Sequence, residues 1–139
     1  MNTSKLTPST IAFLAGGGLT LIGLFPDFYS RGNALSNGFL FYWLPAIFCI
    51  LAAVSAALPA LAGTKLPEPI IGFTQAQLRT VLAGYAALQM ICLIILKDAP
   101  DKALGFWLTL LGAGAACAGA VMSRSEPSSS APPAPPSSF

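Results

Sequence analysis

Histidine is absent from this 139-residue chain, and charged side chains make up only 9% of it. Histidine is the usual general base and metal ligand near neutral pH, so its absence removes the commonest centre for acid–base or metal chemistry. The acidic residues are dispersed between apolar runs and show no metal-ligand spacing. The run Gly16–Gly18 is not followed by Lys and Ser or Thr, so it does not form a phosphate-binding loop. The sequence predicts a protein that is not an enzyme, with no catalytic residues, no cofactor and no metal.

Charge is missing altogether from four long stretches of the chain. These stretches are Pro8–Pro26, Phe39–Gly63, Thr80–Leu96 and Ala103–Ser123. Runs of about 20 apolar residues match the roughly 30 Å hydrocarbon core of a lipid bilayer. A soluble helical core would need polar stripes with a 3.6-residue period, and the first, second and fourth stretches have none. Soluble domains also carry about 25% charged residues, far more than this chain.

The predicted fold class is therefore an all-α membrane protein, with four transmembrane helices in an antiparallel bundle. The transmembrane domain covers residues 1–124, and its spans lie near residues 8–26, 39–62, 76–96 and 103–123. Residues 125–139 form a Pro/Ser-rich tail of low complexity, which predicts a disordered or polyproline II segment. The lipid bilayer is the first partner that this organisation implies.

The lack of ionisable side chains inside the predicted spans argues against several functions. Acidic and basic residues within a membrane usually mark proton relays and ion-coupled transport, so a proton-coupled exporter is not expected. The net charge is only +2, and no basic cluster is present. Nucleic-acid binding is not expected either, because it requires a basic surface that follows the phosphate backbone.

Three cysteines, Cys49, Cys92 and Cys117, each lie inside an apolar stretch. An odd number of cysteines at mid-span positions, without a C-x-x-C pair, argues against a disulfide framework or a redox motif. Buried cysteine behaves as a small hydrophobic residue, so we expect all three to be packing residues.

The first apolar stretch follows Lys5 and resembles a signal peptide, but it ends in Leu24–Tyr29 without a cleavage site of small residues. We therefore expect it to remain in the protein as a signal anchor. Four Lys or Arg residues fall on the side of both termini and three on the other side. This bias favours a topology with both termini in the cytoplasm. The expected location is the plasma membrane, with several crossings.

Small residues recur at four-residue spacing in three of the predicted spans. They include Gly16 in the first span, Ala52 and Ala56 in the second, and Gly112 and Ala116 in the fourth. Within membranes such rows let helix backbones approach closely. We expect these residues to pack against other helices of the chain or against a partner. The glycines of the first span have a second interpretation, as a hinge or as backbone beside a substrate.

Tyr85 and Gln89 are four residues apart in the third span and therefore lie on one helix face. Gln89 is the most polar side chain near any span centre, and an amide in lipid requires a hydrogen-bonding partner. It either joins two helices or contacts a substrate. Just before this span, Thr74–Gln77 match the capping-box pattern that opens a helix. Arg79 is expected to face the lipid headgroups.

Two connecting segments complete the organisation. Pro26–Gly38 is predicted to be a loop, in which Phe28 and Tyr29 fit the aromatic belt of a membrane interface. The six residues Lys97–Lys102 predict a tight hairpin between the third and fourth spans.

The arrangement resembles a family of small four-span membrane proteins of mycobacteria and related actinobacteria, that of the 34 kDa antigenic protein homologue. The resemblance lies in the first span closing on Phe25–Tyr29, in Gly105–Trp107 at the start of the last span, and in the Pro-rich tail Ala131–Pro136. The tail here is far shorter than the family's and lacks its Gly/Tyr/Gln repeats. The resemblance implies the same four-span fold and a cytoplasmic tail, but no site residues.

Two functional hypotheses follow from the sequence. The first is a non-catalytic accessory or scaffold subunit of a larger membrane assembly, whose partners are other membrane protein subunits. The second is a small homo-oligomeric transport or lipid-handling protein, in which Tyr85, Gln89 and the glycines of the first span line a path. In the first hypothesis, the small-residue faces of the second and fourth spans hold the partner, and the tail is a tether.

Overall fold

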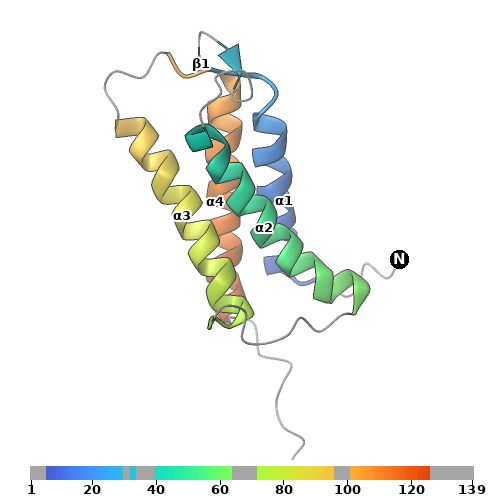
Figure 1. The fold of residues 1–139 in the computed structure, drawn as a ribbon. Helices are drawn as coiled ribbons and strands as arrows, with labels where there is room; N and C mark the ends of the chain where they lie inside the picture. Colours follow the sequence, from blue (N-terminus) through green and yellow to red (C-terminus); the bar gives the residue numbers. More distant parts are fainter. Residues whose placement is uncertain (1–5, 30–31, 34–39, 64–71, 96–100, 126–139) are drawn as a thin grey trace, which may run out of the picture.

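The computed structural model describes residues 6–29, 32–33, 40–63, 72–95 and 101–125, which form four helices and a two-stranded sheet. These elements are α1 (Pro8–Gly23), β1 (Asp27–Tyr29), β2 (Gly32–Asn33), α2 (Leu40–Ala62), α3 (Gln75–Ile95) and α4 (Leu104–Ser125). Figure 1 shows the helices packed side by side in alternating directions, and α4 contacts the other three. The all-α bundle is thus confirmed. The predicted disorder of the tail concerns residues 126–139, which lie outside the described residues.

Three of the described helices, α2, α3 and α4, are long and apolar enough to cross a membrane. Helix α1 is shorter, with 16 residues, or about 24 Å at 1.5 Å per residue. The sequence placed the end of this span at Pro26, but the helix ends at Gly23. Leu24 and Phe25 donate backbone hydrogen bonds to Leu21 and Ile22, three residues back. This tightened turn precedes a proline, whose ring disfavours helical geometry at the residue before it.

Side-chain caps set the starts of α1 and α3. The Thr7 hydroxyl accepts a hydrogen bond from Thr10 N at 3.3 Å, and Pro8 occupies the first turn of α1, where its missing N–H costs nothing. At α3, Gln77 N donates to Thr74 Oγ1 at 3.3 Å and Thr74 N donates to Gln77 Oε1 at 3.0 Å. These reciprocal bonds confirm the predicted capping box.

The sequence predicted a loop after α1, but the structure has a short two-stranded sheet there. Strands β1 and β2 pair antiparallel, with Asp27 opposite Asn33. Phe28 does not lie in an interfacial aromatic belt, because its side chain is fully buried. Its ring packs against those of Tyr42 and Phe106, with centroids 5.7 and 5.5 Å away, and its carbonyl accepts a hydrogen bond from Ala103 N. This strand therefore closes one end of the bundle.

Candidate functional site

The most extensive helix contact in the described part of the chain joins α1 to α4. A Cβ atom added at Gly16 would lie 2.8 Å from both Ala116 N and Gly112 O. One added at Gly112 would lie 2.7 Å from Gly16 O and 2.6 Å from Thr20 Cγ2. All four distances are shorter than real Cβ contacts, so the two backbones touch where only glycine fits. The sequence-predicted residues Gly16, Gly112 and Ala116 are therefore brought together inside the chain.

The same backbone contact continues toward both ends of α1. A Cβ added at Gly105 would lie 2.6 Å from Gly23 O, and one added at Gly119 would lie 3.1 Å from Ser9 O. We call these small residues the α1–α4 seam; they are Gly16, Gly23, Gly105, Gly112, Ala116 and Gly119. The seam holds α1 alongside α4 from Ser9 to Gly23.

Two buried threonines face the seam, and their hydroxyl hydrogens are used within their own helices. The Thr20 hydroxyl donates to Gly16 O and Gly17 O, each 3.0 Å from Oγ1. Thr109 Oγ1 donates to Gly105 O at 2.9 Å. Back-bonding of this kind satisfies a buried hydroxyl without a partner helix. The seam is therefore a packing surface and offers no hydroxyl donor to a ligand.

Helix α2 packs on the opposite side of α1 through its own small residues. A Cβ added at Gly17 would lie 2.8 Å from Ala53 Cβ and 3.2 Å from Cys49 O. Ala52 and Ala56, the packing candidates of this span, are both buried. The five small residues singled out in the sequence thus lie in helix contacts within this chain.

Tyr85 and Gln89 are not brought together, although both belong to α3. Gln89 is only 5% exposed and points into the bundle, whereas Tyr85 is 53% exposed. The Tyr85 ring packs against Phe48 of α2 on the outside, with centroids 5.0 Å apart. A 100° step per residue leaves positions four apart some 40° from each other, enough to separate them at the edge of a buried face. The two side chains therefore do not line one path beside the seam glycines.

The structure reveals a polar contact between α2 and α3 that sequence reasoning missed. Instead of facing the headgroups, the Arg79 guanidinium reaches across to α2. Its Nη2 donates to the backbone oxygen of Ser55 at 2.6 Å, and its Nε donates to Ser55 Oγ at 3.3 Å. Gln75 Oε1 accepts a further hydrogen bond from Nη2 at 3.2 Å, which holds the guanidinium in place.

The reason for this contact lies in Pro59, four residues after Ser55. In a helix the oxygen of residue 55 accepts from the N–H of residue 59, and proline has no N–H to donate. In an apolar environment a carbonyl left without a donor costs several kcal/mol, so the freed oxygen requires another donor. Arg79 supplies it from α3. A Ser–x–x–x–Pro spacing in one apolar span and an Arg near the start of the next was the available signal.

The three cysteines are free and occupy different environments. Cys49 is buried, as expected of a packing residue. Cys117 Sγ lies 3.3 Å from Ala83 O and joins α4 to α3. Cys92 is exposed, which corrects the expectation that all three pack between helices. Among the residues that the structure describes, no three His, Cys, Asp or Glu side chains are close enough to hold a metal ion.

Comparisons with known protein families, curated proteins and solved structures found no match to this chain. The resemblance to the mycobacterial four-span family therefore stays a prediction.

Proposed function

We propose that the chain is a non-catalytic integral membrane protein that serves as an accessory or scaffold subunit of a larger membrane assembly. The observation that carries this proposal is the distribution of side-chain size over the bundle. Glycine, alanine and threonine form the closest helix contacts, and a few larger side chains such as Phe13, Met90 and Phe106 are buried with them. Many other large apolar side chains point outward, from every helix, for example Ile22, Val54, Leu88 and Leu111. Exposed apolar surface of this extent contacts lipid or another membrane protein.

Four crossings are supported by the way α1 follows α4. Helix α4 is long enough to span a bilayer on its own. The seam pairs Gly23 with Gly105 at one end and Ser9 with Gly119 at the other. Because α1 runs beside α4 over this length, a bilayer that covers the outward face of α4 covers α1 too. This placement supports the proposal that the short helix crosses the bilayer with α4, as in the four-span topology predicted from the sequence.

The charges of the described residues support the predicted orientation. Arg79 and Arg124 belong to the end where α3 begins and α4 ends, whereas Asp27, Asp101 and Lys102 belong to the opposite end (Figure 1). Cytoplasmic loops carry an excess of Lys and Arg. The end with the two arginines, where α4 ends, is therefore the cytoplasmic one.

A scaffold role agrees better with the seam than transport does. Transport by this chain would need a path beside Gly16 and Gln89, but Gly16 is pressed against the α4 backbone. Helices held together by backbone contact form a stiff unit whose outward faces remain available. Partner contacts therefore belong to outward positions such as Gly84 and Gly114, where an added Cβ would meet nothing within 4 Å.

Purification of the tagged full-length chain in a mild detergent tests this function. Sizing and mass spectrometry of the eluate should show a membrane protein partner in a fixed ratio. Gly84→Leu and Gly114→Leu, which change outward positions, should weaken this association. A monomer without any partner would contradict the scaffold role. A homo-oligomer alone would favour the transport or lipid-handling hypothesis.

A further inference from the structure

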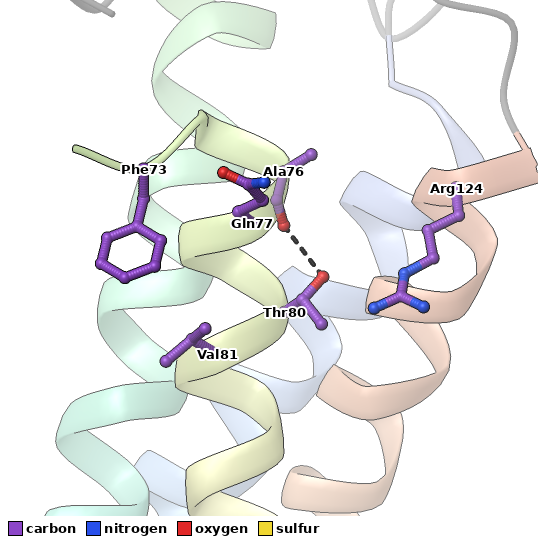
Figure 2. Close-up of a pocket in the computed structure, with 6 residues that line it drawn as sticks. All are labelled: Phe73, Ala76, Gln77, Thr80, Val81 and Arg124. Carbon is purple, nitrogen blue, oxygen red and sulfur yellow. Dashed lines mark hydrogen bonds between the residues drawn. The ribbon is translucent and has the colours of Figure 1, made fainter. Parts of the chain in front are cut away.

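A groove with a volume of about 430 Å³ opens between the start of α3 and the end of α4. It is lined by Phe73, Ala76, Gln77, Thr80, Val81 and Arg124. Figure 2 shows Arg124 on the α4 side, with its guanidinium turned toward Thr80 of α3. Sites for small ligands commonly have volumes of about 300–1,000 Å³. The groove is therefore large enough for a polar headgroup and the first atoms of a chain attached to it.

The charges around the groove select an anion. Arg124 is exposed and forms no ion pair with any residue that the structure describes. Arg79, one residue before Thr80, adds a second positive charge at this end. The acidic residues among the described ones, Asp27 and Asp101, both lie at the opposite end of the bundle. A guanidinium directed back along α4 toward the bilayer needs an anionic partner more than one held in water does.

The α3 side of the groove adds polar groups that suit the same occupant. Gln77 Oε1 is occupied by its hydrogen bond from Thr74 N, so the amide NH₂ is the end of this side chain that a ligand can use. Thr80 Oγ1 donates its hydrogen to Ala76 O at 2.9 Å, so Thr80 has no hydrogen left for an anion and Gln77 is the polar donor on this side. The first turn of α3 also carries the partial positive charge of a helix N-terminus.

The apolar lining distinguishes a lipid from a free anion. Phe73 and Val81 are both exposed at the edge of the groove, in line with the lipid-facing sides of the helices. A free phosphate would gain nothing from these side chains. A phosphate that carries glycerol and acyl chains would cover them, and burial of apolar surface contributes about 25 cal/mol per Å².

We infer that this groove binds the phosphate of an anionic phospholipid. Arg124 pairs with the phosphate oxygens, the Gln77 amide donates to them, and Phe73 and Val81 pack against the upper acyl chain. Arginine matches phosphate well because its planar fork can donate two parallel hydrogen bonds. The inference rests on the proposed membrane placement but not on the scaffold role. It makes this groove a lipid site at the cytoplasmic end of the bundle.

Native mass spectrometry of the full-length chain in a neutral detergent tests this site. Phosphatidylglycerol and phosphatidylcholine with identical acyl chains are added separately. The wild-type chain should retain phosphatidylglycerol in preference, and Arg124→Gln should weaken this binding by about tenfold or more, the effect of losing charged hydrogen bonds. Lys102→Gln, which removes a cation at the opposite end, should bind like the wild type.

A second variant guards against a folding artefact. Gln77→Glu preserves the capping box, because Glu serves at that position as well as Gln, yet it places a carboxylate in the groove. It should lose phosphatidylglycerol while its circular dichroism stays helical. Equal binding by the wild type and both groove variants would overturn the site. Competition by inorganic phosphate as strong as by the lipid would overturn the lipid assignment. Recovery of the chain in the soluble fraction would instead contradict the membrane placement itself.

Discussion

At the scale of single residues, the α1–α4 seam depends on glycine, because glycine has no Cβ atom. The α1 and α4 backbones touch at Gly16, whereas a Cβ at Gly18, two residues away, would meet nothing within 4 Å. Both residues are central glycines of the same helix, so they differ only in what surrounds them. The comparison separates packing from helix propensity.

We expect Gly16→Ala to destabilise the bundle by about 1–3 kcal/mol, because an overpacked contact forces the two backbones apart. Gly18→Ala should be neutral or stabilising by up to about 1 kcal/mol, since alanine favours a helix over glycine. Unfolding of the purified proteins in mixed micelles of rising denaturing-detergent content measures both effects. Equal stabilities of the two variants would show that α1 and α4 do not touch at Gly16.

The contact between Arg79 and Ser55 was explained by the missing N–H of Pro59, and this explanation can be tested directly. Arg79→Leu removes the donor to Ser55 O and the donor to Ser55 Oγ, and should destabilise the bundle by about 1–3 kcal/mol, because it leaves the part-buried oxygen of Ser55 without a donor. Pro59→Ala returns the missing N–H to α2, so Arg79→Leu should cost much less in that background. A double-mutant cycle on the same unfolding assay measures this coupling. Strict additivity would contradict the explanation.

At the scale of the elements, the short strand β1 closes one end of the bundle through Phe28. Its ring is enclosed by Tyr42 and Phe106, while the ring of Phe25, three residues earlier, is exposed. Phe28→Ala should cost about 3–5 kcal/mol, as for other buried aromatic truncations. Phe25→Ala should change stability little, because its ring leaves no cavity behind. Equal losses in the unfolding assay would contradict a buried Phe28.

Helix positions were the most predictable property of these elements. Charge-free runs and the Thr74–Gln77 capping box located the helices, because these signals are local in the sequence. The prediction for Phe28 was wrong because an aromatic residue near the end of a span gives the same sequence pattern whether it contacts headgroups or a neighbouring helix. Arg79 and the separation of Tyr85 from Gln89 could not be predicted either, since both depend on which helices become neighbours.

At the scale of the whole molecule, side-chain size differs between the inside and the outside of the bundle, and charge differs between its two ends. Small residues form the closest helix contacts and many large apolar residues face outward, as expected when the surrounding solvent is lipid. Along the bundle, the described arginines and the described acids belong to opposite ends. The distribution of side-chain size and the distribution of charge both support the proposal of a bilayer-spanning scaffold whose cytoplasmic end carries the anionic-lipid groove.

The central claim is that the chain crosses the membrane at each helix, with α3 beginning and α4 ending in the cytoplasm. Cysteine accessibility in intact cells tests it most directly, in a background in which Cys49, Cys92 and Cys117 are replaced by alanine. Single cysteines are placed at the exposed positions Asp27, Ala76, Asp101 and Ser125. An N-terminal epitope reports the side on which the chain begins, and a membrane-impermeant maleimide is the probe.

Cysteines at Asp27 and Asp101 should react in intact cells. Those at Ala76 and Ser125, and antibody binding to the epitope, should require permeabilisation. Equal reactivity at Ala76 and Asp101 would mean that α3 does not cross, and an accessible epitope together with a reactive Asp27 position would mean that α1 does not. Either result would contradict the four-span account.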